Sequence, residues 1–106
     1  TAFRFETGFA TLEDTAGRSA AQITGGSLAV NFSAREFATT LGLMHPATGS
    51  VTLSRSGRLT DDGMFAARDA QGVVAGAVST DGSQVGYLFQ QLTPQGTLSG
   101  LTQWRR

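Results

Sequence analysis

The chain has 106 residues and no cysteine, and its eight basic residues balance eight acidic ones. This length fits one domain with its own core, and the lack of cysteine excludes disulfides and thiolate chemistry. Because the net charge is zero we expect no binding to nucleic acid, and because every basic residue is an arginine a catalytic lysine is excluded.

The first two predicted strands flank a stretch without periodicity. Residues 3–12 alternate between apolar and polar positions, the pattern of a strand with one buried face. Residues 13–25 keep no such period, so we interpret them as a connection that holds at most a short irregular strand, with Gly25-Gly26 as the turn that follows. A second strand is predicted over 27–33. The inward rows of these two strands are Phe3, Phe5, Thr7 and Phe9, then Leu28, Val30 and Phe32.

The middle of the chain contains two longer predicted strands. Residues 36–44 form the first, and a loop that contains His45, Pro46 and Gly49 ends it, since proline lacks a donor for the ladder. Residues 51–59 form the second, with Gly57 as a bulge or bend. The inward row of strand 36–44 is Phe37, Thr39, Leu41 and Leu43.

The last part of the chain holds four short predicted strands separated by glycine turns. They are Met64 to Ala67, 73–80, 84–92 and 97–104. The Asp81-Gly82 pair between two apolar runs is a strong hairpin signal. No window of eleven or more residues keeps a helical apolar stripe.

These eight short strands predict an all-β fold, a small eight-stranded antiparallel up-and-down β-barrel, with an antiparallel β-sandwich as the alternative. Closure requires the first strand to pair with the last, which we expect to bring Phe3 near Trp104. Many inward residues are small, so the barrel is either flattened or keeps a modest cavity. The polar outward positions, such as Arg4, Glu6 and Gln90, lead us to expect a barrel that does not span a membrane.

The sequence offers little catalytic or metal-binding chemistry. His45 is the single histidine and lies in a predicted loop, so we interpret it as a surface residue. Asp61-Asp62-Gly63 and Asp81-Gly82 lack the spacing of a calcium loop and are interpreted as turns. Glu13-Asp14 and Glu36 have nothing that places them across a cleft. We therefore expect no enzyme activity, no catalytic residue, no cofactor and no metal.

The aromatic residues are the remaining candidates for a binding site. Inward alternation places most of them in a core, but a barrel can also bind ligands at its mouth. Tyr87 and Trp104 carry polar groups that need partners when buried. The candidate ligand or core-mouth residues are Phe3, Tyr87, Phe89 and Trp104.

The run from Gly26 to Trp104 resembles the glycine-rich β-barrel domain that follows the FecR domain in some bacterial FecR-type regulators. The residues that carry the likeness are Leu28–Arg35 with Phe37 and Leu41, Gly57–Leu59, Asp62–Phe65, Val74–Val78, Gly86–Phe89 and Leu98–Trp104. The chain is also similar, more distantly, to the barrel lobes of transferrin-binding-type surface lipoproteins. It departs from those lobes at Gln84-Val85, where an alanine and an acidic residue would be expected.

The first resemblance implies a non-catalytic periplasmic domain that senses or transmits an extracytoplasmic signal toward a sigma factor by protein contact. The second implies the alternative, a surface or periplasmic lipoprotein barrel that binds a small apolar ligand or a host protein. Both imply a periplasmic or cell-surface location in a bacterium. The chain starts at Thr1 without a methionine and ends at Arg105-Arg106, so we expect it to be one barrel domain, 1–106, of a longer protein.

Overall fold

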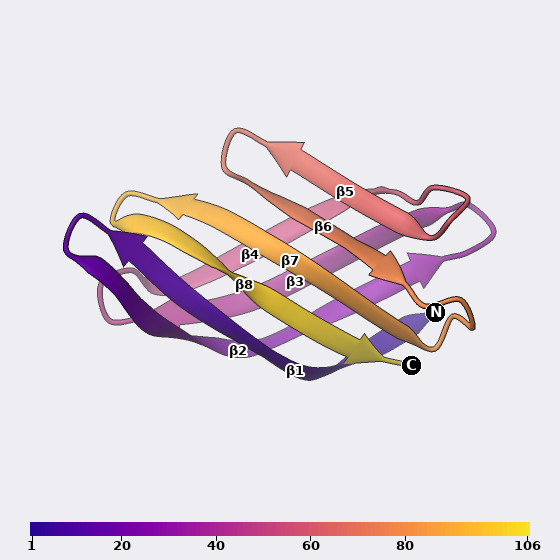
Figure 1. Ribbon diagram of the computed structural model, residues 1–106, viewed down its shortest axis with the longest axis horizontal. Coiled ribbons are helices and arrows are strands. Elements are labelled where there is room, and N and C mark those ends of the chain that lie inside the picture. Colours follow the sequence, from indigo (N-terminus) through magenta and orange to yellow (C-terminus); the bar gives the residue numbers. More distant parts are fainter.

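The computed structural model describes residues 1–106 and contains eight strands and no helix (Figure 1). The strands are β1 (Ala2–Asp14), β2 (Gly17–Asn31), β3 (Glu36–His45), β4 (Gly49–Arg58), β5 (Met64–Asp69), β6 (Gly72–Val78), β7 (Gln84–Thr93) and β8 (Gly96–Arg105). The chain therefore contains no helix that is long and apolar enough to cross a membrane.

All eight strands belong to one antiparallel sheet in the order β4-β3-β2-β1-β8-β7-β6-β5. The predicted pairing of the first strand with the last is confirmed, and it extends from Arg4 opposite Arg105 to Glu13 opposite Thr97. The residue directly opposite Trp104 is Phe5, whereas Phe3 pairs with Leu28 of β2. The up-and-down topology predicted from the sequence is correct.

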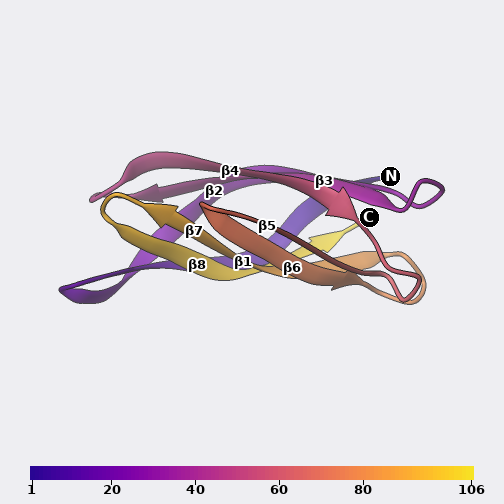
Figure 2. The same cartoon turned by 90° about the horizontal axis from the view of Figure 1, so that it is seen from above.

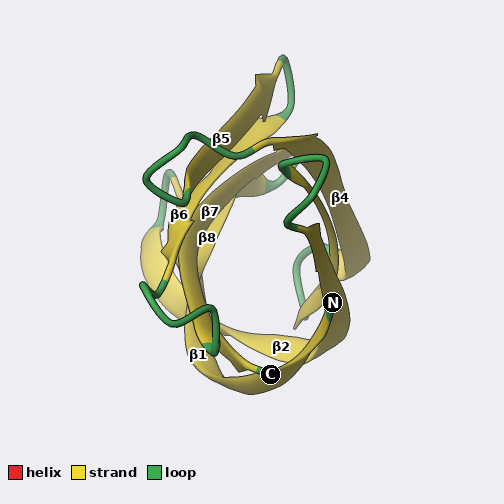
Figure 3. Ribbon diagram, turned by 90° about the vertical axis from the view of Figure 1, so that its right-hand side faces the viewer, coloured by secondary structure: helices red, strands yellow, loops and turns green.

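The sheet curls into a flattened barrel that is nearly closed. Figure 3 shows the strands as an elongated ring, and the molecule measures 44 × 26 × 18 Å. In Figure 2, β2, β3 and β4 lie on one side of this ring and β6, β7 and β8 on the other. Between β4 and β5 the ladder is reduced to a single bridge, Leu59 with Phe65. The seam of the barrel therefore lies between these two strands.

The interpretation of residues 13–25 as a connection is wrong, because most of them belong to β2. The chain reverses within a short turn in which Asp14 Oδ1 accepts a hydrogen bond from the Ala16 amide at 2.8 Å and Gly17 has a positive φ of 127°. Gly25 also has a positive φ, 154°, where the register of β2 against β3 shifts. Gly25 therefore forms part of a bulge inside a long strand instead of a turn before a short one.

Two predicted inward phenylalanines point to solvent. A register shift between Phe5 and Thr7 reverses which side of β1 faces the interior, so Phe9 is exposed and Ala10 is buried. Phe32 lies beyond the end of β2, in a turn where Asn31 Oδ1 accepts a hydrogen bond from the Ala34 amide at 3.0 Å. The predicted strand 27–33 is therefore two residues too long at its C-terminal end.

The proposed bulge at Gly57 is also absent. Gly57 pairs with Phe37 in an unbroken β3–β4 register. A Cβ atom at Gly57 would lie 3.1 Å from the Phe37 ring, so the glycine leaves space for this ring between the strands.

The interior is packed by inward residues from all eight strands and the segments that join them. The predicted row Phe37, Thr39, Leu41 and Leu43 is buried as expected, and Leu28 and Val30 of β2 are buried as well. The buried apolar residues form a single cluster with Phe5, Ala21, Ile23, Val51 and Ala67 packed against it. The sequence allows either a flattened barrel or a barrel with a modest cavity. The structure shows a flattened barrel whose interior is filled by side chains.

Candidate functional site

The four candidate ligand residues all lie in the packed interior. Phe3, Tyr87, Phe89 and Trp104 are each at most 4% exposed. The structure brings Tyr87 and Trp104 together as stacked rings with centroids 5.9 Å apart. Residues that face a ligand site must be reachable by the ligand, and all four of these residues belong to the buried core cluster.

A chain of aromatic rings crosses the interior from β1 to β3. Phe5 meets Trp104 edge to face at 5.4 Å, and Tyr87 meets Phe65 edge to face at 6.3 Å. Phe65 then contacts Phe37 at 4.4 Å. Edge-to-face and offset pairs of this kind add about 0.5–1.5 kcal/mol each to the area that they bury. The rings therefore link β1, β8, β7, β5 and β3 inside the barrel.

The polar groups of Tyr87 and Trp104 have partners inside the barrel. Thr39 Oγ1 donates to the Ser27 carbonyl at 2.9 Å, so the Tyr87 hydroxyl is the donor in its 2.9 Å bond to Thr39. Trp104 Nε1 donates to Thr102 Oγ1 at 2.8 Å, and Thr102 donates to the Tyr87 carbonyl at 3.3 Å. Because these donors are satisfied within the chain, they do not select a ligand.

The Tyr87 phenol offers a test of this buried arrangement. Burial raises the pKa of the phenol above 10, although hydrogen bonds with Thr39 and Thr102 oppose the shift. The unfolded chain releases this proton near pH 10, so stability is fully present below that pH and falls as the pH rises toward the folded pKa. Tyr87 is the sole tyrosine, so near-ultraviolet tyrosinate absorbance reports it alone. A folded protein whose phenol ionises at pH 10 or below would contradict the burial.

His45 and Ser19 are in contact, but the contact is unsuited to nucleophilic catalysis. His45 Nε2 lies 2.7 Å from Ser19 Oγ, and His45 Nδ1 accepts a hydrogen bond from the Ala47 amide at 3.0 Å. The neutral ring therefore carries its proton on Nε2 and donates it to the serine. A general base needs an unprotonated nitrogen facing the hydroxyl, so this pair acts as a surface hydrogen bond.

Most of the acidic residues serve as turn or ion-pair groups. Asp81 Oδ1 accepts hydrogen bonds from Ser79 Oγ and from the amide and hydroxyl of Ser83, at 2.7 to 3.0 Å. The bonds from Ser83, followed by that from Ser79, lower the pKa of Asp81 to about 2. Glu13 pairs with Arg18 at 2.7 Å across the β1–β2 turn. No group of three or more His, Cys, Asp or Glu side chains is placed to hold a metal ion.

One end of the barrel carries a polar hollow of about 720 Å³ beside both chain termini. Arg35 forms an ion pair with Asp61 there, and the Arg106 guanidinium lies 5.9 Å from the centre of the Phe32 ring. The lining is formed by loop residues, and Leu59 and Val78 of the core lie beneath it. The mouth is therefore closed by the core a short way inside.

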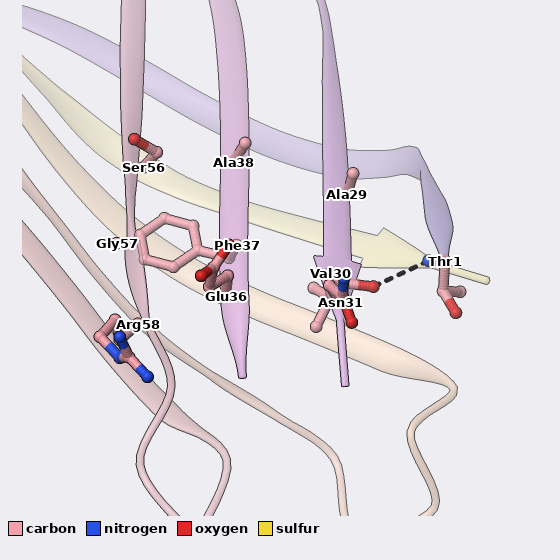
Figure 4. A pocket seen from close by; sticks show the side chains of 10 residues that line it. All are labelled: Thr1, Ala29, Val30, Asn31, Glu36, Phe37, Ala38, Ser56, Gly57 and Arg58. Carbon is pink, nitrogen blue, oxygen red and sulfur yellow. Dashed lines mark hydrogen bonds between the residues drawn. The ribbon is translucent and has the colours of Figure 1, made fainter. Parts of the chain in front are cut away.

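A second hollow, of about 450 Å³, lies where β2, β3 and β4 approach the N-terminus (Figure 4). The ammonium group of Thr1 donates to the Val30 carbonyl at 2.8 Å, and the Phe37 ring lies over Gly57. Glu36 and Arg58 occupy paired positions on β3 and β4. The hollow is small and of mixed polarity, with no group that is buried without a partner.

The outer face of β5 to β8 carries the most apolar surface feature of the molecule. A groove of about 920 Å³ lies there, and eight of its fourteen lining residues are hydrophobic. Met64 is 56% exposed, and Leu88 and Leu101 are each 47% exposed. Clusters of large apolar side chains on the solvent side of a sheet are uncommon. We call this surface, defined by Met64, Ala66, Ala75, Ala77, Leu88 and Leu101, the apolar outer face.

Strand register aligns these residues into one continuous row. Ala66 pairs with Ala75, Ala75 with Leu88, Leu88 with Leu101, and Leu101 with Phe9 of β1. Phe9 is 57% exposed, because the irregularity in β1 turns it outward. The row therefore crosses five strands at right angles to their direction. Sequence reasoning missed it because its members come from separate strands and meet only once the register is known.

Comparisons with known proteins add one structural likeness. No protein-family description matches the chain, and no curated protein matches its sequence. Among solved structures, the chain is similar to the siderocalin Ex-FABP, a protein described as functioning through dual ligand specificities. The two are 11% identical, the match covers 99% of this chain and 70% of that one, and the TM-score is 0.46. This likeness concerns the fold.

Proposed function

We propose that the chain is a non-catalytic interaction domain that holds a protein partner on its apolar outer face. The observation that carries this proposal is the row of apolar side chains from Ala66 to Phe9, of which all but the half-buried Ala75 are exposed. Removing such a row from water favours association, at roughly 25 cal/mol for each Å² buried. A monomeric barrel gains nothing from keeping Leu88 and Leu101 in solvent.

The shape of this surface favours a protein partner. Sites for small molecules are usually concave and bury 70–90% or more of the ligand surface. The groove on β5 to β8 instead lies on the outside of a sheet, between side chains that face solvent. The interior, where a barrel would enclose a ligand, is filled by the aromatic chain and the aliphatic core.

The proposal includes the setting that the resemblance to FecR-type regulators implies. In that setting the domain lies in the periplasm or at the surface of a bacterial cell, and its contacts pass an extracytoplasmic signal toward a sigma factor. The neutral net charge agrees with recognition by apolar contact in place of long-range attraction.

Site-specific photo-crosslinking in the source organism tests the proposal. A photoreactive residue at Leu101 is expected to crosslink to a partner protein, and the same residue at Thr40, exposed on the outer face of β3, is expected not to. Leu101→Lys is expected to abolish the association and to change the free energy of unfolding by no more than about 0.5 kcal/mol, because the side chain already faces solvent. Equal crosslinking at both positions would contradict the proposal.

A second candidate function is the binding of a small apolar ligand in the same groove, favoured by its volume of about 920 Å³ and its apolar lining. This function predicts saturable one-to-one binding of an apolar molecule by the isolated domain, lost in Leu101→Lys. Crosslinking to a protein at Leu101 without such binding would favour the protein partner.

A further inference from the structure

The seam of the barrel leaves part of one strand without a neighbour. Continuing the register from the Leu59–Phe65 bridge places Gly57 opposite Ala67 and Arg55 opposite Asp69. Beyond Asp69 the chain turns into β6, and Figure 3 shows the β5–β6 hairpin projecting outside the ring. Residues 49–54 of β4 therefore pair with β3 on one side and with nothing on the other.

Arg55 marks the point at which this free edge begins. Its side chain is only 9% exposed and bridges the seam, contacting Asp69 at 3.3 Å and Gln91 at 3.0 Å. Its Nε is buried and has no hydrogen-bond acceptor. An unpaired buried donor of this kind costs about 1–3 kcal/mol of stability. The seam therefore lacks a hydrogen-bond acceptor for Arg55 as well as a strand that pairs with β4.

The free edge has none of the features that usually protect an edge strand. The segment Gly49-Ser50-Val51-Thr52-Leu53-Ser54 contains no charged residue and no proline, and its middle residues favour strands. The facing edge of β5, in contrast, carries Arg68 and Asp69. An unprotected edge next to a seam is a template for pairing with another strand.

We propose that the occupant of this edge is a second copy of the chain, paired antiparallel through β4 of each copy. Six residues, Gly49 to Ser54, lie on the free part of the edge, because Asp69 of the same chain lies opposite Arg55. A two-fold pairing of Ser50 to Ser54 that keeps inward residues opposite inward residues is centred on Thr52. This register places Val51 opposite Leu53 on the inner side and Ser50 opposite Ser54 on the outer side.

The charges of β4 agree with self-pairing. Like charges directly opposite each other destabilise a strand pair, and the paired residues Ser50 to Ser54 carry no charge. The new pairing covers Val51, which is half-buried in one copy. One short strand pair gives a small interface, so we expect a dissociation constant between about 1 µM and 1 mM.

Disulfide trapping tests the pairing directly, because the chain has no cysteine of its own. In the Thr52→Cys dimer the cysteine of one copy faces the cysteine of the other across the two-fold axis. Their Cα atoms are then at a separation that a disulfide bond allows. Oxidation is expected to give a covalent dimer. Thr40→Cys is the matched control: it is also exposed but lies one strand away and two residues off the axis in each copy, so its two Cα atoms are about 20 Å apart. Equal trapping of both variants would overturn the proposal.

Charge substitution with sedimentation velocity supplies a reversible test. Thr52→Lys is expected to weaken the dimer about three- to fivefold, since two lysines then face each other. Mixing Thr52→Lys with Thr52→Asp is expected to restore association, and Thr40→Lys is expected to leave it unchanged. A wild-type chain that stays monomeric at about 1 mM, the upper limit set above, would overturn the proposal and assign the edge to a segment of a different protein.

Discussion

Trp104→Ala is expected to lower the free energy of unfolding by about 3–5 kcal/mol, the cost of removing a large aromatic side chain from a packed core. Trp104 is 1% exposed, stacks on Tyr87 and meets Phe5 edge to face. Its removal also leaves Thr102 without the indole donor. Urea unfolding followed by circular dichroism measures the change, because the substitution removes the sole tryptophan fluorophore.

Trp104→Phe is the matched variant, because it keeps a ring between Phe5 and Tyr87 and loses the indole N–H. We expect it to be clearly less destabilising than Trp104→Ala. A loss below about 1 kcal/mol in Trp104→Ala, far from the range for a filled core, would instead indicate that Trp104 lines an open cavity.

Gly100→Ala is expected to destabilise the barrel by about 2–3 kcal/mol through overpacking at the β1–β8 junction. Gly100 pairs with Ala10, and a Cβ atom at this position would lie 1.9 Å from the Phe9 carbonyl oxygen. The main chain of β1 would have to move to accommodate the methyl group. The substitution therefore tests the pairing on which closure of the sheet depends, and the same urea experiment measures it.

Gly86→Ala provides the control for Gly100→Ala. Gly86 lies on the neighbouring strand β7, and the nearest heavy atom to a Cβ there is the Thr102 carbonyl oxygen at 3.8 Å. We expect a change of no more than about 0.5 kcal/mol. Equal effects of the two substitutions would mean that β1 and β8 do not approach as described.

Strand positions were predictable wherever one alternating row continued through a segment. The row from Phe37 to Leu43 needs only period-two alternation, and the structure buries all four of its residues. The pairing of β1 with β8 followed from the argument that eight neighbouring strands avoid free edges by closing. That argument does not predict the seam, because the shortness of β5 leaves residues 49–54 of β4 unpaired on one side.

The errors arose where single residues change the phase of a strand. The β1 irregularity between Phe5 and Thr7 and the β2 bulge at Gly25 each shift the register. A period-two pattern cannot reveal such shifts, since the residues beyond them alternate normally on the opposite face. The alternation therefore predicts Phe9 in the core. The first half of β2 is missed for another reason: no residue of 17–26 is buried, so this half carries no apolar alternation.

The apolar outer face was not predictable from local sequence for a different reason. Leu88 lies between Tyr87 and Phe89, so the run reads as a fully buried strand instead of a strand with two apolar faces. Leu101 and Phe9 can be recognised as part of an apolar surface only when the strand register is known, because the register places them in one row with Leu88. Arg55 was likewise missed, because a charged residue in an inward row becomes visible only through its contacts with Asp69 and Gln91.

The central claim is that the interior of this barrel is filled and that binding takes place on the outer face of β5 to β8. Titration of isotope-labelled protein with the apolar probe anilinonaphthalene sulfonate, followed by nuclear magnetic resonance, tests it most directly. We predict that chemical shifts change at Met64, Leu88 and Leu101, which face solvent, and stay constant at Trp104 and Phe89. Contacts between the probe and the rings of Trp104, Tyr87 or Phe89 would contradict the claim.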